Sequence, residues 1–223
     1  MTTLTTRRFD TSGALDAALA ECLGGAIAAA GASAIMLSGG TTPLPAYRAL
    51  GSRPLPHDER LHVLFSDERY VPRDSEASNY HQSRPLLDAL ALKPARLLRV
   101  RTELPLEQAC EEYERALGAL LDSGVRISLG LLGLGADGHT ASLFSSADLA
   151  RARGHLAIAV RRPDGMSAVS VTPRLLAQVN AVLFVVAGAD KEGAVRALEA
   201  SDPNLTAWLA VQERTAVELW CCC

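Results

Sequence analysis

The sequence predicts an α/β fold built on a mainly parallel, doubly wound, Rossmann-like sheet with helices on both faces. Two observations predict this class. Short apolar stretches alternate with helix-like stretches along the chain, as in strand–helix–strand units. The segment 181–186, Ala-Val-Leu-Phe-Val-Val, contains no polar side chain, which is typical of a strand buried on both faces. We expect residues 1–223 to form a single domain, because no linker-like or repetitive segment interrupts them.

The first half of the chain is expected to begin with a helix over residues 12–30, followed by a strand at 34–37. Pro43 favours the start of a short helix, since proline is well tolerated in the first helical turn. A second strand is expected at 61–65, and Ser78 is a suitable N-cap for a helix that runs to about residue 90. A long helix over 105–121 precedes an apolar strand at 125–132.

The second half of the chain is expected to be richer in strands. Apolar stretches predict strands at 155–160, 168–172 and 181–186, then a helix at 191–200 and an extended segment at 206–211. We expect these strands to join the same mainly parallel sheet.

Composition narrows the possible partners and the compartment. The net charge is −3 with no block of like charges, so we expect no nucleic-acid partner. No apolar run reaches the length of a membrane span, and residues 1–13 lack the apolar core of a signal peptide, so we expect no membrane association. Three of the five cysteines are the last three residues, at a terminus that we expect to be frayed. This is no disulfide framework, and we expect a cytoplasmic protein.

A glycine-rich turn after the strand at 125–132 carries the strongest functional signal. It places Asp137 and His139 two residues apart, between glycines that allow a sharp turn and close approach of a ligand. The spacing Gly133-x-Gly135-x-x-Gly138 also matches a dinucleotide fingerprint, but no carboxylate ends the next expected strand to hold a ribose. A structural turn with a solvated histidine is the other alternative.

A second polar turn, residues 38–43, follows the strand at 34–37. Its backbone N–H groups and hydroxyls, at Gly39, Gly40, Thr41 and Thr42, have the composition of an anion site. The alternative is a plain connection between strand and helix. The sequence lacks the lysine-containing pattern of a nucleotide P-loop.

Two cations follow other expected strands. Arg69 lies in the charged segment 66–72, and Lys191 follows the strand at 181–186. Arginine binds phosphate through paired hydrogen bonds. Taken alone, each segment is also consistent with an ordinary charged surface.

Together these segments resemble the family of 6-phosphogluconolactonases and glucosamine-6-phosphate isomerases. The resemblance rests on residues 37–43, 67–72 with Ser78-Asn79, 133–144 and 188–191. It implies hydrolysis of 6-phospho-D-glucono-1,5-lactone to 6-phosphogluconate in the oxidative pentose phosphate pathway, without a cofactor or metal. It also implies roles for eight residues: His139 as general base, Asp137 as its orienting group, and Gly39, Gly40, Thr41, Thr42, Arg69 and Lys191 as the phosphate site.

The run Ser142-Leu143-Phe144 after the histidine resembles the lactonase branch, because similar deaminases carry a glutamate there. A phosphosugar isomerase or deaminase, and a non-catalytic sugar-phosphate binding module, remain the alternative functions. One departure stands out: where the family usually has an arginine, this chain has Ala168. Arg161, Arg162 or Arg174 is a candidate to replace it.

Overall fold

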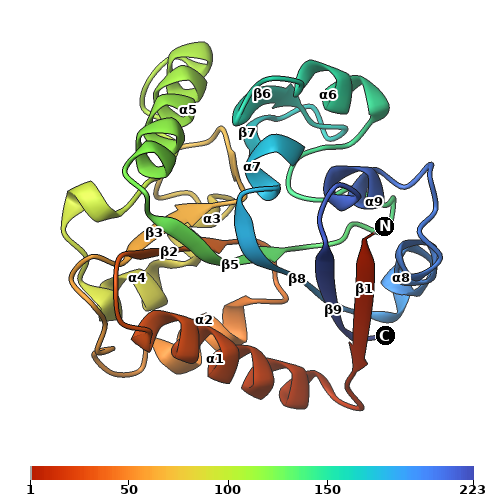
Figure 1. Ribbon diagram of the computed structural model, residues 1–223, viewed down its shortest axis with the longest axis horizontal. Coiled ribbons are helices and arrows are strands. Elements are labelled where there is room, and N and C mark those ends of the chain that lie inside the picture. The colour runs from red at the N-terminus through yellow and green to blue at the C-terminus, as the bar shows by residue number, and fades with distance from the viewer. Residues whose placement is uncertain (1) are drawn as a thin grey trace.

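The computed structural model describes residues 2–223 and contains a six-stranded parallel sheet (Figure 1). Its strand order is β1-β9-β8-β5-β2-β3, and every neighbouring pair in it is parallel. The bounds are Thr3–Arg8 for β1, Ser33–Leu37 for β2, His62–Phe65 for β3, Arg126–Leu132 for β5, Val179–Ala187 for β8 and Ala216–Cys222 for β9. The mainly parallel α/β fold predicted from the sequence is therefore confirmed.

Helices cover both faces of this sheet (Figure 1). One face is covered by α1 (Ser12–Ala28), α2 (Leu44–Leu50) and α4 (Arg84–Leu90). The other is covered by α5 (Leu106–Asp122), α7 (Pro173–Leu176), α8 (Glu192–Glu199) and α9 (Thr206–Val211). The spacing of apolar residues explains the packing: in α1, Leu15, Leu19, Leu23 and Ile27 recur every fourth residue and are all buried, so one stripe of the helix faces the core.

A second, smaller sheet is antiparallel and has the order β4-β7-β6. Its strands are β4 (Asp67–Arg69), β6 (Ala157–Arg161) and β7 (Ser167–Val171). Ser66 joins it to the main sheet, because its N–H donates to Leu37 O and its carbonyl accepts from Val171 N. The prediction that the strands near 155–160 and 168–172 belong to the parallel sheet was therefore wrong: the tight turn between them forms an antiparallel hairpin.

Three further expectations differ from the structure. Residues 206–211 are helical rather than extended, because α9 packs on α7 and α6 (Ser146–Arg151). The helix expected at 78–90 is interrupted at Ser83, which separates α3 (Asn79–Gln82) from α4. The chain's last residues are not frayed: Cys221 and Cys222 lie in β9, paired between β1 and β8, and Cys221 is buried.

Among residues 2–223, no helix combines the length and the apolar character needed to span a membrane.

Candidate active site

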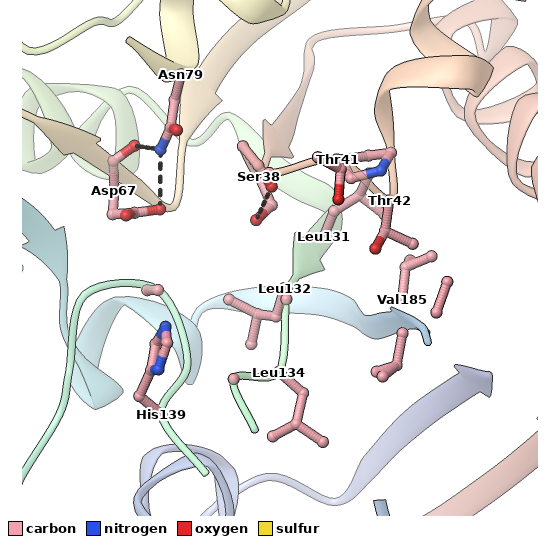
Figure 2. Close-up of a pocket in the computed structure, with 18 of the residues that line it drawn as sticks. Ser38, Thr41, Thr42, Asp67, Asn79, Leu131, Leu132, Leu134, His139 and Val185 are labelled. Carbon is pink, nitrogen blue, oxygen red and sulfur yellow. Dashed lines mark hydrogen bonds between the residues drawn. The ribbon is translucent and has the colours of Figure 1, made fainter. Parts of the chain in front are cut away.

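A pocket opens where β2, β5 and β8 end at their carboxyl edge (Figure 2). Such edges are the usual ligand sites of open α/β sheets. Its floor is apolar and its walls are polar, and its lining includes Ser38, Gly39, Gly40, Thr41, Thr42, Asp67, Arg69, Asn79, Leu131, Leu132, His139, Arg162, Val185 and Lys191. All of the predicted site residues except Asp137 therefore line one pocket.

His139 and Asp137 form a hydrogen-bonded pair at this pocket. His139 Nδ1 lies 2.5 Å from Asp137 Oδ1, which leaves Nε2 as the nitrogen available for chemistry. Burial alone would raise the pKa of Asp137, but hydrogen bonding and attraction from His139 outweigh it and lower that pKa. Asp137 therefore remains a carboxylate that orients the imidazole. The His139 side chain is 26% exposed and lines the pocket.

Glycine at 135 makes the pair possible. A Cβ atom at Gly135 would lie 2.1 Å from His139 Nδ1 and 2.3 Å from Asp137 Oδ1, so any larger residue would displace both groups. Phe144 fixes the other side of the imidazole, with its ring centroid 4.4 Å from that of His139. The two contacts hold the ring in place at the edge of the pocket.

The turn at 38–43 forms the opposite wall, where Figure 2 shows Thr41 and Thr42 across the pocket from His139. Gly40 has φ +90°, a conformation that favours glycine. Its N–H donates to Gln82 Oε1 at 3.2 Å. Gly39 is required for space, because a Cβ atom there would lie 1.9 Å from Asn79 Oδ1.

The two predicted cations enter the pocket from different elements. Arg69 ends β4, and its Nη1 donates to Ala77 O at 2.9 Å. Lys191 ends the 3₁₀ turn Ala189–Lys191 after β8, and its Nζ lies 3.6 Å from Asp190 Oδ2. Lys191 is 27% exposed at its side chain, so its ammonium group is accessible to a ligand.

The charged segment around Arg69 is not a surface loop. Asp67 and Glu68 are both buried, and Asp67 accepts hydrogen bonds from Ser66, Asn79 and Ser142. Glu68 Oε1 accepts from Asn79 N at 2.7 Å, and its Oε2 accepts from Tyr80 N at 2.8 Å. Burial raises the pKa of Glu68 to about 7, against the opposing effect of these backbone hydrogen bonds.

Sequence reasoning treated Ser78-Asn79 as a helix cap, and Ser78 does accept from His81 N. It missed the second role of this dipeptide. Asn79 is 1% exposed, contacts Asp67 and packs against Gly39. The pairing of an acidic dipeptide in one segment with a Ser-Asn dipeptide about ten residues on was the available signal.

Of the three arginines considered for the place of Ala168, only Arg162 lines the pocket. Arg161 is exposed. Arg174 donates to Gly154 O, on the surface.

Comparison with known proteins identifies the family of this chain. The family model described as glucosamine-6-phosphate isomerases/6-phosphogluconolactonase matches residues 8–220. The chain belongs to this family. It is 38% identical over 161 residues to the 6-phosphogluconolactonase of Thermotoga maritima, covering 70% of each chain. It is 32% identical over 231 residues to the human 6-phosphogluconolactonase, covering 95% of this chain and 88% of the human one.

Solved structures of the family agree with the fold. The 6-phosphogluconolactonase structure from Thermotoga maritima superposes with a TM-score of 0.80 at 28% identity, covering 99% of this chain and all of that chain (100%). A monomeric glucosamine-6-phosphate deaminase superposes with a TM-score of 0.80 at 18% identity, covering 97% of this chain and 96% of that chain. At that identity the likeness to the deaminase concerns the fold alone.

Proposed function

We propose that this protein hydrolyses 6-phospho-D-glucono-1,5-lactone to 6-phosphogluconate in the cytoplasm, with His139 as general base. The observation that carries the proposal is the His139–Asp137 pair at the edge of a pocket whose opposite wall is the polar turn 38–43. Relatives named 6-phosphogluconolactonase support the reaction. A protein that only bound sugar phosphates would have no need of an oriented base in its pocket.

The chemistry begins at His139. The Nδ1–H group donates to Asp137, so Nε2 carries the lone pair that takes a proton from water. The water oxygen then bonds to the lactone carbonyl carbon, and the π electrons move onto the carbonyl oxygen. When this tetrahedral intermediate collapses, the bond between C1 and the ring oxygen breaks. The proton held by His139 passes to that oxygen, which restores the base.

The remote phosphate supplies the orientation. In this proposal the 6-phosphate is held by the turn of residues 39–42, through its hydroxyls and the N–H groups other than that of Gly40, together with Arg69 and Lys191. Binding energy from the far end of a substrate positions the reacting carbonyl against the base. The reaction as written needs no metal or cofactor.

The direct test follows the lactone as glucose-6-phosphate dehydrogenase generates it, and compares its decay with and without this protein. Spontaneous hydrolysis is subtracted from both traces. Accelerated decay that is lost in a His139→Gln variant supports the proposal. Decay at the spontaneous rate in the presence of folded wild-type protein would refute it.

A further inference from the structure

The small antiparallel sheet presents one face to the pocket, and strand register decides which side chains lie on it. Arg69 of β4 is aligned with Ala168 of β7, which is aligned with Val160 of β6. Directly opposite residues share a face, and so do residues two apart on one strand. Arg162 is two residues beyond Val160, and its N–H donates to Met166 O at 2.8 Å. It therefore lies on the same face as Arg69 and Ala168.

A buried hydroxyl holds Arg162 there. Its Nη1 lies 3.2 Å from Ser142 Oγ, and Ser142 Oγ lies 2.7 Å from Asp67 Oδ2. The hydroxyl has one proton, which it donates to the carboxylate, so its lone pair accepts from the guanidinium. Asp164 binds Nε at 3.1 Å. The Arg162 side chain is only 13% exposed, so its position is fixed from two directions.

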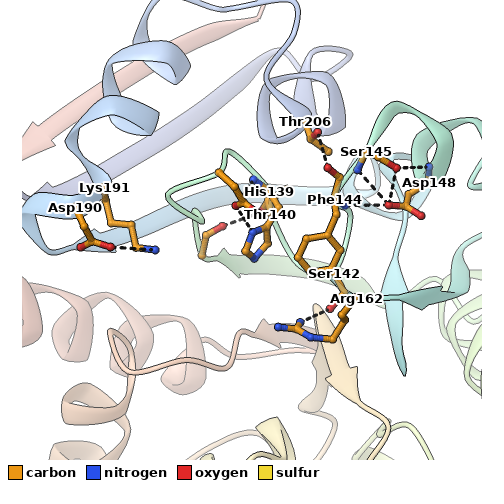
Figure 3. A network of polar contacts seen from close by, with 12 residues as sticks. His139, Thr140, Ser142, Phe144, Ser145, Asp148, Arg162, Asp190, Lys191 and Thr206 are labelled. Carbon is orange, nitrogen blue, oxygen red and sulfur yellow. Dashed lines mark hydrogen bonds and ion pairs between the residues drawn. The ribbon is translucent and has the colours of Figure 1, made fainter. Parts of the chain in front are cut away.

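Arg162 and His139 both contact the ring of Phe144. The guanidinium carbon of Arg162 is 5.1 Å from the centroid of the Phe144 ring, and that same ring contacts His139. Figure 3 shows Lys191 on one side of His139 and Arg162 on the other, below Phe144. Arg162 and His139 therefore contact the same aromatic ring, and Lys191 lies on the other side of the imidazole in this view.

We infer that Arg162 stabilises the negative charge that forms on the lactone carbonyl oxygen, and that Ser142 and Asp67 are positioning residues for it. The inference rests on the proposed function. It adds the Arg162 guanidinium to the groups that act on the transition state of the proposed hydrolysis. When water attacks, the carbonyl oxygen becomes an alkoxide, and the product carries a carboxylate at the same carbon. A fixed guanidinium that lines the same pocket as the base suits both anions, because it needs no reorganisation as the charge develops.

The first test compares two lactones, one with and one without the 6-phosphate. Arg162→Gln should lower kcat by about 10²–10³-fold on both, the usual effect of losing an oxyanion donor. Arg161→Gln is the matched control, because that neighbouring arginine is exposed and does not line the pocket. It should leave both rates unchanged. Arg162→Lys, which keeps the charge but loses the planar fork, should recover part of the lost rate.

Ser142 provides a second variant. Ser142→Ala should lower kcat by roughly tenfold, and the Ser142→Ala/Arg162→Gln double variant should be no slower than Arg162→Gln alone, as expected for groups that act in one chain. Thermal unfolding of each variant checks that it is folded. An additive loss in the double variant would overturn the positioning role.

A binding measurement keeps the inference independent of turnover. The probes are 6-phosphogluconate and glucitol 6-phosphate, which differ only in whether C1 carries a carboxylate. Calorimetry with Arg162→Gln should show about tenfold weaker binding of 6-phosphogluconate and nearly unchanged binding of glucitol 6-phosphate. Equal weakening of both probes, or a rate loss confined to the phosphorylated lactone, would make Arg162 a phosphate ligand and overturn the inference. A wild-type protein that binds the probes but hydrolyses neither lactone would refute the proposed function instead.

Discussion

Replacing Ala168 with arginine tests whether this chain has lost the family's cation or relocated it. Ala168 is fully buried, at 0% exposure, and is aligned between Arg69 and Val160 in the small sheet. Arg162 lies on the same face and lines the pocket. A new arginine at 168 therefore has to enter space next to two existing guanidinium groups.

Two separable effects determine how much Ala168→Arg lowers the folding stability. Adding a long side chain at a filled position costs about 1–3 kcal/mol of folding stability through overpacking. Ala168→Met carries a similar bulk without charge, so it measures this part alone. The additional cation is repelled by Arg69 and Arg162, so Ala168→Arg should be less stable than Ala168→Met. It should also bind 6-phosphogluconate no more tightly than the wild type.

Urea denaturation gives the free energies of unfolding, and calorimetry gives the affinities. The decisive variant is the double exchange Ala168→Arg/Arg162→Ala, which moves the cation from β6 back to β7. It should recover stability and turnover relative to either single variant, because the face again carries two guanidinium groups, as in the wild type. If Ala168→Arg alone is as stable as the wild type and binds 6-phosphogluconate more tightly, then Arg162 does not replace the arginine that is missing at position 168.

Three other outcomes are expected. His139→Ala should lower kcat by about 10²–10⁴-fold in the lactone assay with little change in KM, and near-normal turnover would remove His139 from the mechanism. Arg69→Ala and Lys191→Ala should each cost roughly 1.5–3 kcal/mol in kcat/KM for the phosphorylated lactone and almost nothing for unphosphorylated glucono-δ-lactone; equal losses on both would contradict a phosphate site. Burial raises the pKa of Glu68 from 4.5 to about 7. The protonated side chain therefore makes its full contribution to folding stability below pH 4.5, and this contribution is lost as the pH rises through about 7. The free energy of unfolding of the wild type, measured relative to that of Glu68→Gln, should fall by most of about 3 kcal/mol between about pH 5 and pH 8. If the difference between the two proteins does not change with pH, this prediction is refuted.

Much of the fold could be predicted because apolar strands and amphipathic helices alternate visibly along the chain. The failures have local causes. The strands near 155–160 and 168–172 are apolar like the parallel strands, and only their pairing across a tight turn makes them antiparallel. The segment 206–211 contains β-favouring residues, but its packing on α7 overrides that preference. Only the first four residues of β9 alternate between exposed and buried, and Glu218 interrupts its apolar run, so the sequence did not predict this strand.

Most of the site residues identified from the sequence share one property: they lie on segments that follow strands of the parallel sheet, at the carboxyl edge of that sheet. That holds for the turn at 38–43, for His139 and for Lys191, so topology alone brings them together. Asn79 and Phe144 lack this property. Asn79 reaches the pocket through the hydrogen bonds that bind α3 to Asp67 and Glu68, and Phe144 through a ring contact. Such contacts depend on tertiary packing, so the motifs that contain Asn79 and Phe144 do not reveal what these side chains touch.

Arg162 shows why a missing motif residue is weak evidence for a missing function. The role inferred for Arg162 needs a guanidinium on the pocket face of the small sheet, and it does not need a particular strand. Position 162 lies one residue beyond β6, and position 168 lies in β7, the partner strand of the same hairpin; the register between Val160 and Ala168 gives both positions the same face. A cation lost from β7 can therefore be supplied from the end of β6, provided that the residue at 168 is small. Ala168 meets that condition, and the Ala168→Arg variant tests whether Arg162 depends on it.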